Sequence, residues 1–371
     1  MKTTNSQNSE RLLSLDLFRG LTMFFLVLEG TEFYGYVKEA STEGSFFYNI
    51  IMQFHHHPWN GLRFWDLIQP YFMFIVGVAM VFSINKRLNK GVEKSQITKH
   101  IIIRSITLFF LGVILHCGYS HKLVWELWNV LTQLGFTILI SYALFNLRIR
   151  YQFIFSIMLL VITEILYRYT NIAGFDQPFV IGKNFGSYID LILMNKINGG
   201  GWVVINFLPT SAHTIWGVIA GKILISKKID QEKFKIIAVA GIIGIITGYS
   251  LDWLGITPVI KRICTSSFVI VSGGWALLTL AIFYYLVDIK KLNKGFTIIV
   301  AVGMNSIFIY LFSQSVGGQW FNEFVNIFVF GFAQFLSVPI QFSNIINSLV
   351  VFSLELYLCY WLYRRKIFFK I

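Results

Sequence analysis

Charged side chains are scarce in this sequence. Asp, Glu, Lys and Arg together make up only 13% of its 371 residues, whereas 56% of the residues are hydrophobic. Soluble globular proteins carry roughly a quarter of charged residues, so the composition excludes an ordinary soluble protein. Apolar runs recur along the chain at the length of about 20 residues that a helix needs to cross a bilayer while satisfying its own backbone hydrogen bonds.

Cysteine and proline are also rare, with three and six residues respectively. Cys117, Cys264 and Cys359 are dispersed and show no CxxC spacing, so neither a disulfide framework nor a cysteine metal site is indicated. No stretch has the composition of a soluble domain. We therefore expect a single integral membrane domain over 1–371, with 1–15 as a short cytoplasmic tail.

The apolar runs predict an all-α polytopic membrane protein, a bundle of about ten transmembrane helices. Segment 319–338 is apolar enough to span, but one more crossing would place the basic C-terminus outside, so we interpret it as an interfacial or re-entrant helix. Segment 169–201 is expected to be a loop with one short helix. The expected spans are 17–37, 67–85, 100–117, 128–147, 151–168, 202–221, 236–255, 267–287, 296–314 and 345–363.

The net charge of +13 is unevenly distributed. The connections 86–99 and 222–235 each hold five lysines or arginines, whereas Lys122 is the only one in the expected connection 118–127. Cytoplasmic connections are the ones enriched in Lys and Arg, so both termini are expected in the cytoplasm. Topology and contact with anionic lipids explain the positive charge, and nucleic acid is not expected as a partner.

The stretch FHHHPWNGLRFWD, from Phe54 to Asp66, holds three of the seven histidines between the first two expected spans. A metal site is not expected, because successive residues point in different directions and no cysteine or carboxylate pair lies nearby. The plain interpretation is an interfacial loop whose tryptophans join an aromatic belt. The alternative is one histidine that acts as a base or a nucleophile.

Polar side chains inside the expected spans are costly in lipid and usually face a partner or a cavity. Asp16 and Arg19 are three positions apart, so an ion pair on one helix face is expected. Four further residues each have a structural alternative, either reaching the headgroups or bonding between packed helices. They are Glu29, Arg104, Asn305 and Ser306.

Several segments, in order along the chain, resemble the heparan-α-glucosaminide N-acetyltransferase family and its bacterial members. They are RLLSLDLFRG, HHHPWNGLRFWDLIQPYFMFIVG, IIIRSITLFFLGVIL, VLTQLGFTILISYAL, TIWGVIAGKIL and GMNSIFIYLFS. The block around WNG is the most specific. The resemblance implies an acyltransferase of the bacterial inner membrane that moves an acetyl group from cytosolic acetyl-CoA to an amino sugar or glycan on the non-cytoplasmic side.

The resemblance also implies roles for particular residues. The family's catalytic histidine lies three positions before the Trp of WNG, which is His56 here, and Arg104 matches an arginine of the family's RS motif. Arginines at the cytoplasmic side would hold the phosphates of acetyl-CoA, and His56 would act as general base or acyl carrier. The remaining expected site residues are Asn60 and Asp66 beside the histidine, Asp16 and Arg19 for the donor, and Glu29, Trp59, Asn305 and Ser306 for the sugar or the oxyanion.

Two other classes of function stay open. A transporter or flippase for a sugar or lipid-linked sugar would use the embedded charges as a gate, and inverted repeats would favour it. A structural membrane protein is the third class. The expected partners are acetyl-CoA, the sugar acceptor and membrane lipids, and a homodimer stays open. The sequence names neither the sugar nor the choice between N- and O-acetylation.

Overall fold

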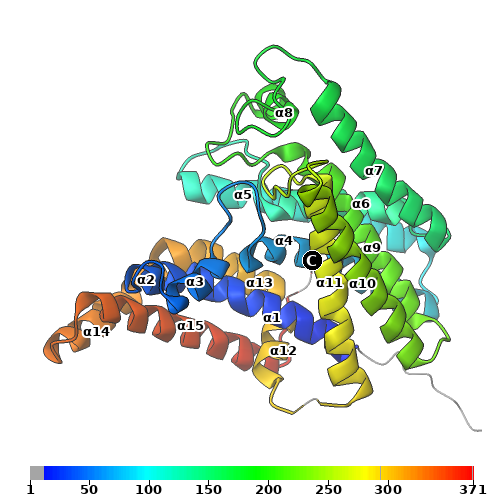
Figure 1. Ribbon diagram of the computed structural model, residues 1–371. Helices are drawn as coiled ribbons and strands as arrows, with labels where there is room; N and C mark the ends of the chain where they lie inside the picture. The colour runs from blue at the N-terminus through cyan, green and yellow to red at the C-terminus, as the bar shows by residue number, and fades with distance from the viewer. Residues whose placement is uncertain (1–11, 293, 370) are drawn as a thin grey trace, which may run out of the picture.

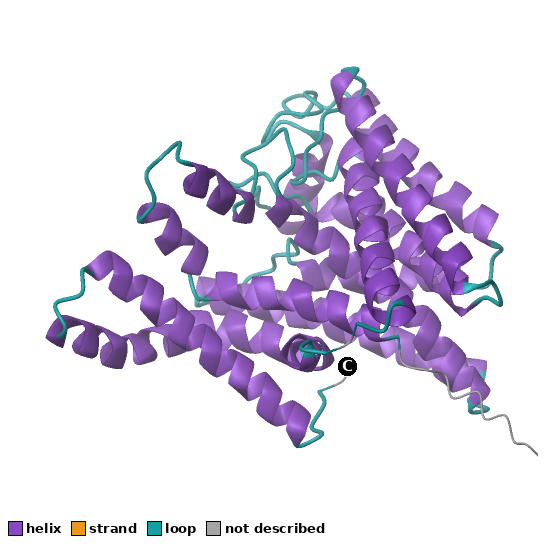
Figure 2. Cartoon of the chain, turned by 60° about the horizontal axis from the view of Figure 1, so that its bottom comes forward, coloured by secondary structure: helices purple, strands orange, loops and turns teal. Residues whose placement is uncertain are grey.

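The computed structural model describes residues 12–292, 294–369 and 371, and most of them are helical (Figures 1 and 2). Within this part of the chain no strand forms, and an isolated β-bridge pairs Asn60 with Ile260. The prediction of an all-α protein is confirmed. Most of the expected tail, 1–15, lies outside the described residues, and α1 (Leu13–Gly30) begins within it.

Six helices of the described part are long and apolar enough to cross a membrane. They are η2 with α4 (Phe64–Asn89), α5 (Lys94–Ser120), α7 (Ile149–Tyr169), α10 (Asp230–Trp253), α11 with η4 (Ser266–Ile289) and α15 (Ile340–Arg364). The expected spans 17–37, 128–147 and 202–221 correspond to α1, α6 (Val130–Ala143) and α9 (Phe207–Ile225), which are shorter or more polar. The helices fit a polytopic membrane protein, and the expected number of about ten crossings is not confirmed.

The expected span 296–314 is interrupted. α12 (Thr297–Met304) ends at Asn305, whose backbone leaves helical geometry at φ −114° and ψ 31°. A second helical run follows through α13 (Ser306–Phe312), the π-helix η5 (Ser313–Phe321) and α14 (Asn322–Phe335), bent by 79° from α12. The expected helix at 319–338 is therefore the end of this run, and the bent pair is either a broken span or a re-entrant segment.

Glycines let the central helices approach closely, as is common between helices packed in membranes. A Cβ atom on Gly77 of α4 would lie 2.0 Å from the carbonyl oxygen of Thr214 in α9, and one on Gly217 would lie 2.1 Å from that of Phe74. α10 and α11 meet in the same way at Gly274, where an added Cβ atom would lie 2.6 Å from the Ile245 nitrogen. These contacts fix α4 within the bundle, and with it the preceding 3-10 helix η2 (Phe64–Leu67), which carries Asp66.

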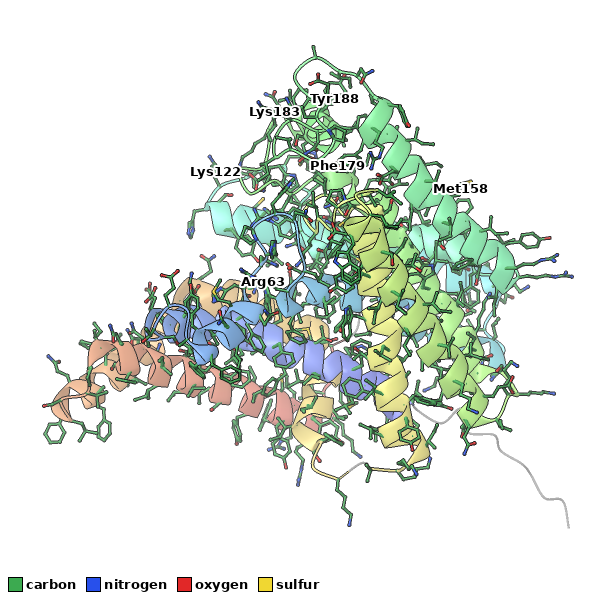
Figure 3. All side chains as sticks on the ribbon, in the orientation of Figure 1. Arg63, Lys122, Met158, Phe179, Lys183 and Tyr188 are labelled. Atoms are coloured by element: carbon green, nitrogen blue, oxygen red, sulfur yellow. The ribbon has the colours of Figure 1, made fainter. Side chains whose placement is uncertain are left out.

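Residues 170–203 form a cap over one end of the bundle, with α8 (Phe185–Met194) as its only helix, followed by η3 (Val204–Asn206). Figure 3 shows Phe179, Lys183 and Tyr188 in this cap above the helices. The Asp190 carboxylate ties it down, accepting hydrogen bonds from Trp128 Nε1 and from the Val204 nitrogen, both at 2.8 Å. The predicted loop with one short helix at 169–201 is confirmed.

Short helices lead from α1 to the histidine run at the capped end. They are α2 (Phe33–Glu39), α3 (Phe46–Ile51) and η1 (Met52–Phe54). Phe54 stacks on Tyr34 with ring centroids 4.8 Å apart and lies 5.4 Å from Phe64, at the start of η2. This aromatic cluster holds both ends of the loop that carries the histidines.

Candidate active site

His56 and Asp66 form a hydrogen-bonded pair at the start of α4. His56 Nδ1 lies 3.0 Å from Asp66 Oδ1, and the aspartate side chain is only 1% exposed. Its other oxygen accepts hydrogen bonds from the backbone nitrogens of Arg63 at 2.9 Å and His57 at 3.2 Å. The loop therefore folds around one carboxylate, which fixes the orientation of the imidazole.

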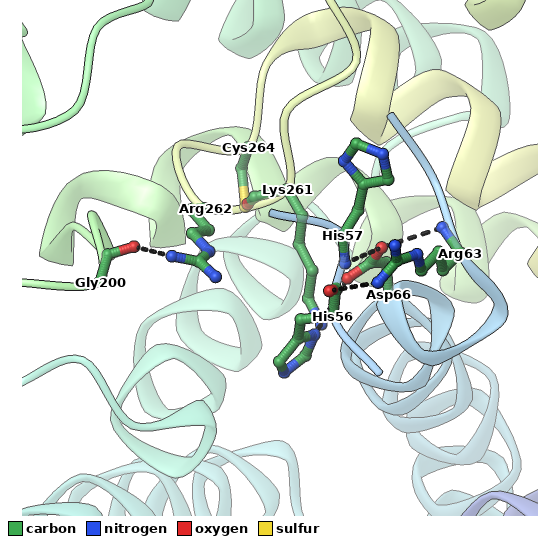
Figure 4. A network of polar contacts seen from close by, with 8 residues as sticks. All are labelled: His56, His57, Arg63, Asp66, Gly200, Lys261, Arg262 and Cys264. Carbon is green, nitrogen blue, oxygen red and sulfur yellow. Dashed lines mark hydrogen bonds and ion pairs between the residues drawn. The ribbon is translucent and has the colours of Figure 1, made fainter. Parts of the chain in front are cut away.

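Lys261 completes this group from a distant loop. Its Nζ atom lies 3.1 Å from His56 Nδ1 and 3.7 Å from Asp66 Oδ1 (Figure 4). The two loops are joined by the bridge between Asn60 and Ile260 and by a 2.8 Å hydrogen bond from the Gly61 nitrogen to the Val259 carbonyl. Lys261 could not be predicted from the sequence, because no motif or spacing links it to the histidine run.

The surroundings keep the His56 imidazole neutral. Its ring lies 5.5 Å from Trp202, over which Lys261 Nζ also sits at 5.4 Å. Desolvation, and then the positive charge of Lys261, lower the pKa of His56 to about 4, although Asp66 acts to raise it. Desolvation likewise lowers the pKa of Lys261 to about 8, against the pull of Asp66. A neutral imidazole can accept a proton near neutral pH.

His56 faces a cavity of about 390 Å³, here called the histidine cavity. Its wall combines tryptophan and tyrosine rings with carboxamides and one carboxylate, Glu29, a mixture suited to a polar ligand of ring size. The polar and aromatic wall residues are Glu29, His56, Trp65, Gln69, Phe72, His116, Tyr119, Trp128, Asn129, Asn198, Trp202, Lys261, Tyr310 and Gln314.

A second cavity, of about 360 Å³, lies farther along the same helices and is here called the arginine cavity. Its cationic and titratable wall residues are Arg19, Arg87, His100 and Arg104. Phe72, Val130 and Tyr310 line both cavities, and α1, α4, α5, α6 and α13 contribute to the walls of both. These three side chains therefore lie at the boundary between the two cavities.

Arg19 and Arg104, both expected at the donor site, line the arginine cavity. Arg19 Nη1 lies 3.6 Å from Asp16 Oδ1, the ion pair that the spacing predicted. The Nε atom of Arg104 is buried and has no hydrogen-bond partner among the described residues. A buried guanidinium NH without a partner suits an anionic ligand.

Four residues expected at the histidine or the acceptor neither line the histidine cavity nor contact His56 through their side chains. Trp59 Nε1 donates to the Phe179 carbonyl at 2.7 Å and so anchors the cap, while Asn60 contributes its backbone to the bridge. Asn305 holds the C-terminal segment, donating to the Ile367 carbonyl and accepting from the Phe369 nitrogen, each at 3.1 Å. Ser306 lines the arginine cavity instead. The structure thus brings His56, Asp66 and Glu29 together without these four.

A second histidine and carboxylate, also missed from the sequence, meet at the histidine cavity. His116 Nδ1 lies 2.9 Å from Glu126 Oε2, and Lys196 of the cap forms an ion pair with the same carboxylate. Burial acts to raise the pKa of Glu126, but hydrogen bonds from Lys196 and His116 outweigh it and lower that pKa. Over the described residues, no three or more His, Cys, Asp or Glu side chains are grouped to hold a metal ion.

No family model matches the chain. Two curated proteins are similar to it, the heparan-alpha-glucosaminide N-acetyltransferases of Mus musculus and Homo sapiens, each 26% identical over 99% and 97% of this chain respectively. The chain spans 62% and 60% of the length of these relatives. It is a distant relative of the heparan-alpha-glucosaminide N-acetyltransferase family.

Proposed function

We propose that this protein is a membrane acetyltransferase that moves an acetyl group from acetyl-CoA to an amino sugar or glycan. The observation that carries the proposal is that Phe72, Val130 and Tyr310 line both the arginine cavity and the histidine cavity. A cationic chamber thereby adjoins a chamber that holds a neutral, carboxylate-bound imidazole. The relatives' names, which specify N-acetyl transfer to a glucosaminide, support the same reaction class.

The arginine cavity would hold the donor. Coenzyme A carries several phosphate charges on its nucleotide end and a long, thin thioester arm. Arg19 and Arg104, with Arg87 at the end of α4, would bind the phosphates through charge-assisted hydrogen bonds. The arm would then extend past Tyr310 and bring the thioester carbon to the histidine cavity.

His56 would act as the general base. When Nδ1–H donates to Asp66, the lone pair on Nε2 is free to take a proton from the acceptor nitrogen as that nitrogen attacks the thioester carbon. The C–N bond forms, the C–S bond breaks, and the departing thiolate takes up the proton. Lys261 would pair with Asp66 and oppose premature protonation of the ring.

We place the arginine cavity on the cytoplasmic side of a bacterial inner membrane and the capped end on the other side. Acetyl-CoA is cytosolic, and the basic connection 86–99, which the positive-inside rule assigns to the cytoplasm, begins at the same end as Arg87. The sugar would then enter the histidine cavity from beneath the cap. Both termini would be cytoplasmic.

A sugar transporter is the second candidate, because two cavities in line along one set of helices also suit a transport path. One assay separates the two functions. Purified protein in nanodiscs is given labelled acetyl-CoA and a panel of amino sugars, and the same protein in sealed vesicles is tested for uptake of the unmodified sugars. Acetylated product from the wild type supports the enzyme, whereas sugar flux without product supports the carrier.

His56→Ala and His55→Gln form the matched pair of variants. His55 lies in the same histidine run but bonds to the Tyr34 carbonyl at 3.3 Å and does not line the histidine cavity. We expect His56→Ala to lose product formation on the order of 10² to 10⁴-fold, as removal of a general base does. His55→Gln should keep near wild-type rates. Equal rates in the wild type and His56→Ala would refute the proposed role.

A further inference from the structure

The two histidines of the histidine cavity sit in matching surroundings. Each histidine and the residues around it are here called a unit. In the first unit His56 Nδ1 lies 3.0 Å from the Asp66 carboxylate, and in the second His116 Nδ1 lies 2.9 Å from the Glu126 carboxylate. A lysine pairs with each carboxylate, Lys261 in the first unit and Lys196 in the second.

A tryptophan completes each unit. Lys261 lies 5.4 Å from the Trp202 ring centroid, and Lys196 lies 5.8 Å from that of Trp128. The imidazole of each unit also lies near its tryptophan, at 5.5 Å for His56 and 6.4 Å for His116. The chain thus builds one arrangement twice, from different helices and loops, and turns both copies to one cavity.

From this duplication, and resting on the proposed function, we infer that His116 is a second proton acceptor of the reaction. It removes a proton from the bound ammonium form of the acceptor before His56 acts, and the acceptor is left as the free amine. Glu126 orients the ring so that Nε2 is its free nitrogen.

In acetyl transfer the acceptor nitrogen gives up two protons. An amino sugar is largely an ammonium ion near neutral pH and has no lone pair for attack. Its nitrogen therefore loses one proton before attack and a second as the amide forms. The thiolate takes up one proton and solvent receives the other. A single imidazole that still held the first proton would be unable to accept the second, whereas two imidazoles give each proton its own acceptor.

The environments of the two units differ in a way that assigns the roles. The carboxylate partners differ: Lys261 beside Asp66 is 6% exposed, whereas Lys196 beside Glu126 is 55% exposed, although the His56 ring, at 38%, is itself more exposed than that of His116, at 17%. A proton accepted at His116 would pass to the Glu126 carboxylate, whose lysine partner is open to solvent. The buried cation beside His56 keeps that ring neutral until attack, since it resists formation of an imidazolium.

Other charged and titratable groups face His116 from neighbouring elements. The Tyr119 ring lies 5.6 Å away on the same helix. Across the cavity lie Glu29 of α1, Tyr310 of α13 and the first unit itself. The Glu29 carboxyl group would accept hydrogen bonds from the ammonium group of the acceptor in the space between the two histidines.

The test is the pH profile of acetyl transfer by full-length protein in nanodiscs, with glucosamine as the probe acceptor. His116→Asn is compared with His121→Asn, a matched change at a histidine that does not line the cavity and whose left-handed backbone, φ 48°, asparagine tolerates. At about pH 6, where the acceptor is an ammonium ion, His116→Asn should lose at least about tenfold in rate. Toward about pH 9, where free amine is abundant, the rate should approach that of the wild type.

Glu126→Gln serves as the second variant, because it keeps a hydrogen-bond acceptor beside His116 and changes little volume. Like His116→Asn, it should lose rate at low pH and recover it at high pH, but the loss should be smaller. A loss that is equal at all pH values would mean a merely structural role and overturn the inference, as would a wild-type profile in His116→Asn. Wild-type protein that acetylates no amino sugar at any pH would instead refute the proposed function itself, and this inference with it.

Discussion

Lys261 Nζ lies 3.1 Å from His56 Nδ1, although 205 positions separate the two residues in the chain. The contact is made by two loops at the capped end that are joined through the backbone of Asn60 and Gly61. Because Asp66 lies within reach of both side chains, the three titratable groups form one electrostatic unit. Lys261, a residue outside the histidine motif, therefore adds to desolvation in lowering the pKa of the imidazole.

Replacing Lys261 with Met should raise the pKa of His56 from about 4 toward its usual value, because a neighbouring positive charge is lost. In the wild type the folded-state pKa lies below the unfolded one, so the unfolded chain binds more protons as pH falls from about 6.5 through 4, and stability is lost over that window. The variant should lose less stability there. Titration of ¹⁵N-histidine resonances, with His56→Gln for assignment, measures the shift. Lys261→Arg is the control, and a His56 pKa unchanged in Lys261→Met would contradict the coupling.

Arg104→Gln should weaken use of the donor while leaving the chemical step intact. The buried Nε of Arg104 has no partner among the described residues, so a bound phosphate would supply one. Loss of a charged hydrogen bond should raise KM for acetyl-CoA by about tenfold and change kcat little. Arg150→Gln is the control, because Arg150 bonds to Tyr151 at an exposed site. A raised KM for the sugar, with that for acetyl-CoA unchanged, would argue against a donor site at Arg104.

Much of the helical pattern could be predicted from apolar runs, since hydropathy depends on composition within one segment. The pairing of His56 with Asp66 was also within reach of sequence reasoning, because both residues belong to one short loop. The contacts of Lys261 and Lys196 were not, since each joins segments far apart in the chain and no periodic pattern encodes such a meeting. The break of the helix at Asn305 could not be predicted for a different reason. One asparagine barely changes the hydropathy of an apolar run, yet its side chain bonds to the C-terminal segment where α12 ends.

Gly77→Ala should destabilise the bundle where α4 meets α9. The added Cβ would lie 2.0 Å from the Thr214 carbonyl oxygen, so the two backbones would have to separate. Overpacking of this kind costs about 1–3 kcal/mol. Gly118→Ala in α5 is the matched control, because a Cβ there meets nothing within 4 Å and alanine favours the helix by up to about 1 kcal/mol. Thermal unfolding in detergent compares the stability of the two variants. Equal melting temperatures would show that α9 moves away from α4 without loss of stability.

Val130→Phe tests the junction between the two cavities most directly. Val130 lines both cavities, so a larger ring at this position would block the boundary that the thioester arm crosses in the proposed mechanism. The nucleotide end would keep its arginine contacts. We therefore expect product formation to fall by about 10²-fold, as misplacement of a reacting group does, with a much smaller change in the Kd of acetyl-CoA.

Val130→Ala provides the control for Val130→Phe, because it widens the junction and should retain both acetyl-CoA binding and acetyl transfer. Equilibrium binding of labelled acetyl-CoA and product formation are measured on the same nanodisc samples, so that a misfolded variant is recognised by loss of both. Unimpaired transfer by a well-folded Val130→Phe protein would mean that the acetyl group reaches His56 by another route. We expect Val130→Phe to bind acetyl-CoA without transferring the acetyl group, and Val130→Ala to do both. This result would require the two cavities to act as one path.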